Sequence, residues 1–237
     1  MPYFPYFRKA SLDFFTGLRD HNSKPWFEAH REDYEHHVKE PMQALVAAMD
    51  ARFARFAPEI GGDPRRSVFR LHRDIRFSKD KSPYKTHTAC WFFHRAAHKS
   101  VGQEAEGGSA GFYFHLQPGA SFVGGGMWMP PRPLLERFRA AIAKDPKGFG
   151  KLLAEPRLRK RFGGFSDENQ LKRMPRGYAE DHPAAPWLRQ TSFTLGRRLT
   201  DAQVTSARLP ATLEADFALM LPIVRWLNGV LGLPARK

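Results

Sequence analysis

The chain has 237 residues, of which 42% are hydrophobic and 13% aromatic, so it can bury a sizeable core. The charged fraction of 26% argues against disorder throughout, and the single cysteine, Cys90, excludes a disulfide framework within the chain. The net charge is +14, and no apolar run of about eighteen residues is present to span a membrane. The first residues lack the long apolar core of a signal peptide, so we expect a cytoplasmic protein.

The first quarter of the chain predicts helices. Apolar residues recur at helical spacing over residues 11–20, and a turn follows in which Asn22 or Ser23 can cap a second helix. That second helix is long, with one apolar stripe that continues to Phe56. Pro41 lies within it and must kink the helix or split it in two, because proline cannot donate the backbone hydrogen bond.

The apolar period changes from helical to two after a turn-rich stretch at residues 58–64. The candidate strands are residues 67–77, 87–95, 110–117 and 120–129, and residues 191–198 could return to the same sheet. Short turns between consecutive strands favour antiparallel pairing over a doubly wound sheet.

Helical patterns return after Pro130. Asp145 followed by Pro146 is typical of a helix start, Thr200 and Gln203 form a capping-box pattern, and a last helix is expected over roughly residues 210–231. No repeat and no long linker divides the sequence. We therefore expect a single α+β domain over residues 1–237, with an antiparallel sheet from residues 67–129 and 191–198 packed with N- and C-terminal helices.

The positive charge is concentrated in two segments. Residues 65–99 carry ten basic and two acidic side chains, and residues 137–176 carry twelve and four. An evenly solvated surface would not give this distribution, so an anionic partner is indicated. The alternative is an arginine-rich surface without a function.

The first basic segment contains an unusual motif. Alternation along a strand would place Arg70, His72, Asp74 and Arg76 on one face, where two arginines can chelate a phosphate or carboxylate and Asp74 can orient a guanidinium. The following loop, residues 78–86, adds lysines and hydroxyl groups that can surround an oxyanion. The candidate ligand-binding residues of this motif are Arg70, Arg73, Arg76, Lys79, Lys81 and Lys85.

The run from Arg70 to Thr86 resembles the signature of a bacterial and fungal family known only as domain-of-unknown-function family 2461. The similarity extends in order over nearly the whole chain. It includes Asn22 with Trp26-Phe27-Glu28, the run Gly124-Gly125-Gly126-Met127-Trp128, the run from Lys172 to Tyr178, and His182-Pro183. His72 stands where the resemblance implies an aromatic residue, and Arg176 stands where it implies lysine. The resemblance implies an α+β fold and no established activity.

Three other patterns are weaker. Lys172, Arg173 and Arg176 form a second basic cluster that could fold over the Arg70 motif as another wall, or remain a solvated loop. The glycine run at residues 124–126 lacks the ending of a phosphate-binding loop and indicates a bulge or a close backbone approach. The histidines have no spacing diagnostic of a metal site, so none is expected, and Cys90 is interpreted as a buried thiol.

Three functions compete. The leading hypothesis is an anion site for a phosphate-bearing ligand, in which proton transfer would fall to one of Asp74, His72, Tyr84 and His182. The second is a nucleic-acid-binding protein that stacks bases on Tyr84, Trp91, Trp128 or Tyr178. The third is a scaffold in which carboxylates of the long acidic helix, such as Glu28 and Glu35, pair with the motif arginines. The sequence identifies no cofactor, reaction or oligomeric state.

Overall fold

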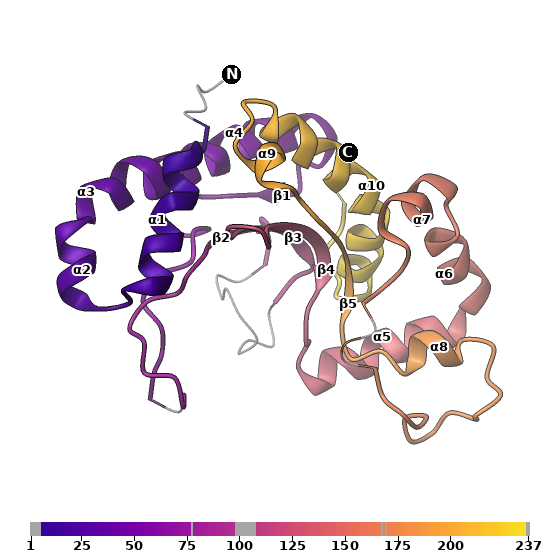
Figure 1. Cartoon of the computed structure of the whole chain (residues 1–237). Helices are drawn as coiled ribbons and strands as arrows, with labels where there is room; N and C mark the ends of the chain where they lie inside the picture. Colours follow the sequence, from indigo (N-terminus) through magenta and orange to yellow (C-terminus); the bar gives the residue numbers. More distant parts are fainter. Residues whose placement is uncertain (1–5, 77, 98–107, 167, 169, 236–237) are drawn as a thin grey trace.

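The computed structural model of the chain is a curved antiparallel sheet with helices packed on one face (Figure 1). It describes residues 6–76, 78–97, 108–166, 168 and 170–235. The strand order is β1-β2-β3-β4-β5, and every neighbouring pair is antiparallel. The strands are β1 (Ile60–Gly61), β2 (Thr88–His94), β3 (Gly111–Leu116), β4 (Phe122–Met127) and β5 (Phe193–Arg198).

Helices from both ends of the chain pack on this sheet, which confirms the expected α+β class. The N-terminal group is α1 (Lys9–Asp20), α2 (Lys24–Ala29), α3 (Arg31–Tyr34), the π-helical turn η1 (Glu35–Lys39) and α4 (Glu40–Phe56). The later helices are α5 (Arg132–Lys144), α6 (Pro146–Leu153), α7 (Pro156–Phe162), α8 (Ala185–Leu188), α9 (Asp201–Val204) and α10 (Leu209–Val230). The expected caps at Asp145 and Thr200 are both formed.

The core lies between the sheet and the helices α4 and α10. Phe112 of β3 stacks on Phe217 of α10 with ring centroids 4.6 Å apart, and Phe53 of α4 packs on the same two rings. Burial of these large aromatic side chains supplies much of the apolar driving force for folding. No helix among the described residues is long and apolar enough to cross a membrane.

Pro41 lies at a change in helix type, from the π-helical turn η1 to the α-helix α4. The expected single long helix is divided into α2, α3, η1 and α4, and the π-helical turn ends just before Pro41. Proline has no N–H to donate to the carbonyl four residues earlier, which belongs to His37. The hydroxyl of Ser11 donates to that carbonyl oxygen at 2.6 Å instead, so α1 satisfies the acceptor that Pro41 leaves open.

The expected strand at residues 67–77 is not a regular strand. Only two isolated bridges join it to the following segment, Val68 to Cys90 and His72 to Tyr84. Residues 69–71 lie between the two bridges on one side of the pairing, and residues 85–89 lie between them on the other. Because these segments differ in length, a bulge interrupts the pairing. Exposure still alternates, with Arg70, His72, Asp74 and Arg76 exposed and the residues between them less so. Phe77 lies outside the described residues.

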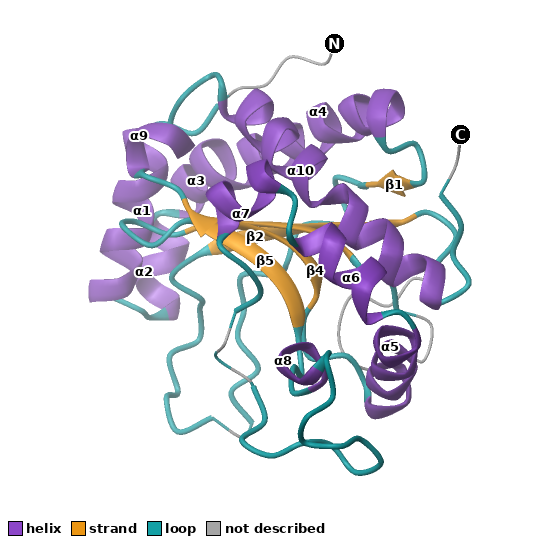
Figure 2. Ribbon diagram, turned by 90° about the vertical axis from the view of Figure 1, so that its right-hand side faces the viewer, coloured by secondary structure: helices purple, strands orange, loops and turns teal. Residues whose placement is uncertain are grey.

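The side of the sheet that faces away from α4 and α10 is called the open face below. Figures 1 and 2 show loops rather than helices on this side of the described chain. Side chains alternate between the two faces of each strand, so the open face carries the strand residues that point away from the core. They are Ala89, Trp91, Phe93, Gly111, Tyr113, His115, Phe122, Gly124, Gly126, Thr194, Gly196 and Arg198. None of these residues is acidic.

Candidate functional site

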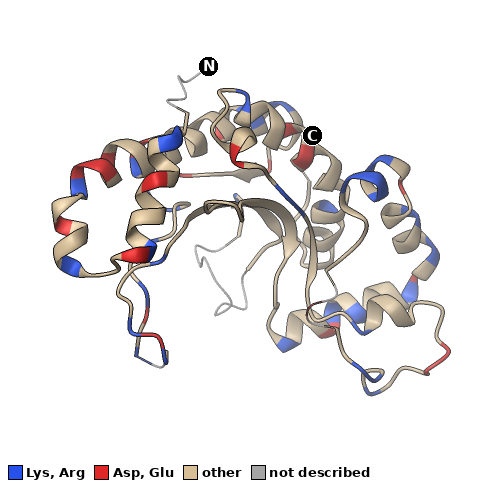
Figure 3. Ribbon diagram, in the orientation of Figure 1, with Lys and Arg blue, Asp and Glu red and all other residues tan. Residues whose placement is uncertain are grey.

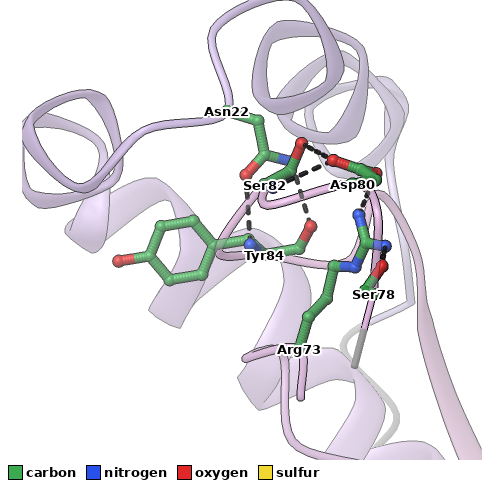
Figure 4. Close-up of polar contacts among 6 residues, drawn as sticks. All are labelled: Asn22, Arg73, Ser78, Asp80, Ser82 and Tyr84. Atoms are coloured by element: carbon green, nitrogen blue, oxygen red, sulfur yellow. Dashed lines mark hydrogen bonds and ion pairs between the residues drawn. The ribbon is translucent and has the colours of Figure 1, made fainter. Parts of the chain in front are cut away.

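The basic motif forms an irregular hairpin whose tip is held by Asp80. The guanidinium of Arg73 donates to the Asp80 carboxylate and to the hydroxyl of Ser78, and the N–H and hydroxyl of Ser82 donate to the same carboxylate at 2.9 and 2.6 Å (Figure 4). These bonds, those from Ser82 first, hold the pKa of Asp80 well below its usual range. The Arg73 side chain therefore stabilises the conformation of the hairpin.

Asn22 fastens this hairpin to the helices. Its amide donates to the carbonyl oxygen of Tyr84 at 3.0 Å and accepts from the N–H of Tyr84 at 3.1 Å (Figure 4). Ser23, the other expected cap, begins α2 by accepting from Trp26. The ring of Tyr84 is buried and stacks on Phe27, with centroids 4.5 Å apart. Asn22, Phe27 and Tyr84 thus belong to one structural joint, and Tyr84 is not accessible for stacking bases.

Asp74 and Arg76 form an exposed pair at the end of the hairpin. The guanidinium of Arg76 donates to both carboxylate oxygens of Asp74, at 3.0 and 2.6 Å, and lowers the pKa of Asp74 to about 2. A carboxyl group with this pKa is ionised at neutral pH and is a weak base, which disfavours it as a proton acceptor. The acidic helix residues pair locally, Glu28 with Arg31 and Glu35 with Lys39, rather than as the scaffold hypothesis requires.

Arg70 and Lys85 are cations of the motif without a direct contact to a described carboxylate. Neither side chain makes an ion pair or hydrogen bond with the residues that the structure describes. Hydrogen bonds from Arg76, and then the charge of Arg70, lower the pKa of Asp74, so that carboxylate is within electrostatic reach of Arg70, although it pairs with Arg76. The Lys85 ammonium lies 5.8 Å from the ring centroid of Phe69, and Phe69 packs edge-on against Tyr113 of the open face. Burial, and then the charge of Arg70, lower the pKa of Lys85, so the two cations lie within electrostatic reach of each other.

Arg70 and Lys85 form a corner beside the open face. Two histidines and a tyrosine lie next to this corner, and none of them was predicted as a site residue. The rings of His87 and His115 are 4.3 Å apart, and the hydroxyl of Tyr113 is 3.1 Å from Nδ1 of His115. On the other side of the ring, Nε2 of His115 is 3.0 Å from Oε1 of Gln117. If Nε2 donates to Gln117, Nδ1 accepts from Tyr113, which is one consistent proton arrangement.

The electrostatics keep this group neutral. Burial first, then His115 and Lys85, lower the pKa of His87 to about 4, and burial lowers that of His115. Burial also raises the pKa of Tyr113 to about 12. Among the described residues, no carboxylate contributes to the shifts of Lys85, His87 or His115. The corner therefore offers cations and neutral donors to a ligand.

The second basic cluster lies on a different rim of the molecule. Lys172, Arg173 and Arg176 are exposed on the long loop between α7 and α8, away from the hairpin (Figure 3). The described hydrogen bonds and ion pairs do not join this loop to the hairpin. His182 also lies here, where its Nδ1 accepts from the N–H of Ala184 and supports the turn into α8. The loop and the hairpin therefore border the open face rather than form one pocket.

Two hollows occur elsewhere on the surface. One, of about 400 Å³, lies between α7 and α10 beside Arg161 and Asp216, and the other, of about 500 Å³, lies between α6 and the loop beside Trp187. Neither contains a residue of the hairpin. Among the described residues, no group of three or more His, Cys, Asp or Glu side chains is placed to hold a metal ion. Cys90 is buried, and burial raises the pKa of its thiol.

The predicted site residues are thus divided among six settings. Arg73 with Asp80 shapes the hairpin tip, Arg76 with Asp74 forms an exposed pair, and Tyr84 is in the core. Lys81 donates to the carbonyl of Ile75, and Lys79 and His72 are exposed on the hairpin. Lys172, Arg173, Arg176 and His182 lie on the other rim. Arg70 and Lys85 are the predicted cations that remain beside the open face.

Comparison with known families matches residues 10–226 to the family described as conserved hypothetical protein (DUF2461). This match covers most of the chain, so the protein belongs to that family, and the resemblance noted in the sequence is confirmed. Comparisons with curated proteins and with solved structures gave no match.

Proposed function

We propose that the protein binds a phosphate-bearing ligand at the corner formed by Arg70 and Lys85. One observation carries this proposal: two neighbouring cations, one of them half-buried, make no ion pair with the described carboxylates, and Asp74, whose pKa is lowered by Arg76 and then by Arg70, is already paired with Arg76. Two like charges held close together repel unless an anion compensates them. The energetic cost of this arrangement is offset when a ligand supplies the missing negative charge.

The chemistry of the two side chains favours phosphate over a single carboxylate. Arg70 can present a planar fork of donors, and Lys85 adds a point charge that a second phosphate oxygen can accept. A phosphate group near neutral pH carries between one and two negative charges, which matches two cations better than one carboxylate does. The neutral imidazoles of His87 and His115 add polar groups next to the anion without adding repulsion.

The paired residues of the motif have a positioning role in this proposal. The Arg73–Asp80 pair closes the hairpin tip, and Asn22 fixes the backbone at Tyr84, the residue before Lys85. Lys85 is therefore held between a fixed backbone and the ring of Phe69. A preorganised cation loses less conformational entropy when it binds an anion.

Thermal unfolding with added ligands tests the proposal. Inorganic phosphate, pyrophosphate and a sugar phosphate should each raise Tm, because a ligand that binds only the folded state stabilises it. Acetate should raise Tm less. The changes Arg70→Gln and Lys85→Met should each remove most of this ligand-dependent increase.

Arg65→Gln and Lys147→Met are matched controls, because both residues are exposed cations without a described side-chain ion pair. They should retain the increase in Tm. Equal stabilisation of all four variants would show that phosphate binds elsewhere. No stabilisation of the unmodified protein by any phosphate compound would overturn the proposal.

A further inference from the structure

Two glycines leave part of the open face without side chains. Gly124 of β4 and Gly196 of β5 lie opposite each other in the register, and we call them the glycine strip. A Cβ atom at Gly124 would lie 3.3 Å from the carbonyl oxygen of Leu195, and one at Gly196 would lie 3.0 Å from that of Val123. Neither glycine has a positive φ. The two glycines thus let the neighbouring backbones approach closely and leave this part of the open face without side chains.

The adjacent glycines have different reasons to be glycine. Gly126 has φ of 128°, and a Cβ there would lie 1.9 Å from the carbonyl oxygen of Phe193. Gly125 faces the core, where a Cβ would lie 2.7 Å from the sulfur of Met220. Gly126 confirms the close backbone approach expected from the sequence, whereas Gly125 is packed against side chains. The neighbouring strand approaches Gly124 and Gly196 less closely than it approaches Gly126.

Exposed aromatic residues stand at both ends of β4. Phe122 is 37% exposed and Trp128 is 56% exposed. Alternation within β4 directs Phe122 to the side of Gly124, and Trp128 follows the last residue of the strand, Met127. Phe122 stacks on His115, with ring centroids 4.7 Å apart, which leaves it held as a rigid platform. Phe122 is the first residue of β4 and Trp128 follows its last, so an extended strand of this length places the two residues about 20 Å apart. Planar groups could stack at both ends of the strand.

Charge around the strip is positive. Arg198 lies opposite Phe122 in the register, and its side chain has no ion pair or hydrogen bond with the described residues. The Arg70–Lys85 corner borders the same face through Phe69 and Tyr113. Since the open face has no acidic residue, its chemistry suits a ligand with planar rings and several negative charges.

We propose that the phosphate-bearing ligand is a single-stranded nucleic acid that lies along the glycine strip. Bases stack on Phe122 and Trp128, and the backbone contacts Arg198 and the Arg70–Lys85 corner. A single strand fits better than a duplex, because duplex bases are already stacked and cannot reach the two rings. This inference rests on the proposed phosphate site and adds the class of ligand that the site takes.

Fluorescence anisotropy with labelled oligo(dT) and oligo(U) of about twelve nucleotides tests the inference. Single strands should bind more tightly than a duplex of the same length. With about three phosphates contacted, the logarithm of the association constant should fall with the logarithm of salt concentration with a slope of about −2. Phe122→Ala and Trp128→Ala should each weaken binding by about tenfold.

Gly196→Val adds a side chain to the strip and should weaken binding by a similar factor. Leu219→Ala and Gly229→Val are matched controls, because both residues belong to α10 on the opposite side of the sheet and a Cβ at Gly229 would meet nothing within 4 Å. Both controls should bind as the unmodified protein does. Circular dichroism of every variant verifies that the fold is retained.

The outcomes separate this inference from the proposed phosphate site. If phosphate raises Tm through Arg70 and Lys85 but no oligonucleotide binds, the nucleic-acid inference is wrong and the phosphate site stands. If oligonucleotides bind the folded Phe122, Trp128 and Gly196 variants without loss, binding reflects net charge alone and the inference is overturned. If binding depends on Phe122 but not on Arg70 or Lys85, the phosphate site has been placed wrongly.

Discussion

The protein places arginines in two opposite environments. On the helix side of the sheet, the buried carboxylate of Asp216 in α10 accepts from Arg161 of α7 at 2.7 Å and from Arg197 of β5 at 2.9 Å. Beside the open face, Arg70 and Lys85 make no ion pair with a described carboxylate, and Asp74, the carboxyl group whose pKa is lowered by Arg76 and then by Arg70, is already paired with Arg76. Residues of the same chemical type therefore fasten elements together in one region and lack a direct ion pair in the other.

This difference separates structural cations from candidate ligand-binding ones. A buried carboxylate that holds two guanidinium groups has its hydrogen-bonding capacity satisfied, and removal of one partner leaves charge buried without compensation. Cations that repel each other contribute little to the stability of the fold. Binding of an anionic ligand gives a reason for two such cations to lie side by side. Net charge alone could not make this distinction, because both regions are rich in arginine.

Asp216→Ala should have the largest effect on the free energy of unfolding. It removes the shared acceptor of Arg161 and Arg197, and loss of one member of a buried ionic network costs about 3 kcal/mol. Urea denaturation measures the change. Glu28→Ala is the comparison, because Glu28 pairs on the surface with Arg31 and such pairs contribute little. Equal stability of the Asp216 and Glu28 variants would contradict a structural role for the Asp216 network.

Asn22→Ala should have the second largest effect. It removes both hydrogen bonds to the backbone of Tyr84, which costs about 2 kcal/mol when a half-buried N–H and carbonyl lose their partner. Asn22→Asp keeps the acceptor but loses the donor, so its stability should lie between the two. Hydrogen exchange of the hairpin amides should accelerate in the same order. Unchanged exchange in Asn22→Ala would show that the joint does not hold the hairpin.

The pH dependence of stability reports on the corner beside the open face. Burial depresses the pKa of His87 to about 4 in the folded protein, whereas an unfolded histidine has a pKa near 6.5. The unfolded chain therefore binds more protons between these values, so stability is present above pH 6.5 and is lost as the pH falls toward 4. After allowance for partial solvent exposure, the contribution is about 1 kcal/mol.

His87→Gln should remove that contribution. Urea denaturation at pH 7 and pH 5 should show a smaller loss of stability on acidification in the variant than in the unmodified protein. His36→Gln is the control, because His36 is exposed on the N-terminal helices. An identical pH dependence in His87→Gln and the unmodified protein would contradict the buried, neutral state of His87.

The smallest effect on the free energy of unfolding is expected for a residue that binds the proposed ligand. Without ligand, Arg70→Gln should leave stability within about 0.5 kcal/mol of the unmodified protein or slightly increase it, because it relieves repulsion with Lys85. The pKa of Lys85 should rise in the same variant, which NMR of the lysine side chain can follow. A destabilisation as large as that of Asp216→Ala would place Arg70 among the structural arginines.

Local patterns in the sequence were sufficient for most of the fold. Period-two alternation located β2 to β5. The cap at Asp145 followed from the adjacent Pro146, and the cap at Thr200 followed from Gln203 three residues later. The two-residue strand β1 and the bulged hairpin were not predicted. A strand as short as β1 has no periodic signal, and the bulge depends on how residues 67–76 pair with residues 83–91.

The site was only partly predictable for a related reason. The motif identified Arg70 and Lys85. It could not show that Asp80 forms an ion pair with Arg73, whereas Arg70 forms none with the described residues, since both depend on the fold of the loop. His87, His115 and Tyr113 were missed because their proximity arises from strand pairing rather than from spacing in the chain. Alternation over residues 112–117 was a usable signal, since it directs Tyr113 and His115 to the same face.

A crystal soaked with tungstate, a heavy analogue of phosphate, gives the most direct test of the anion site. The tungsten anomalous signal locates the anion independently of the protein density. We expect a peak within hydrogen-bonding distance of the Arg70 guanidinium and the Lys85 ammonium, and its loss in crystals of Arg70→Gln. Tungstate bound only elsewhere, with this corner empty, would show that Arg70 and Lys85 do not form an anion site.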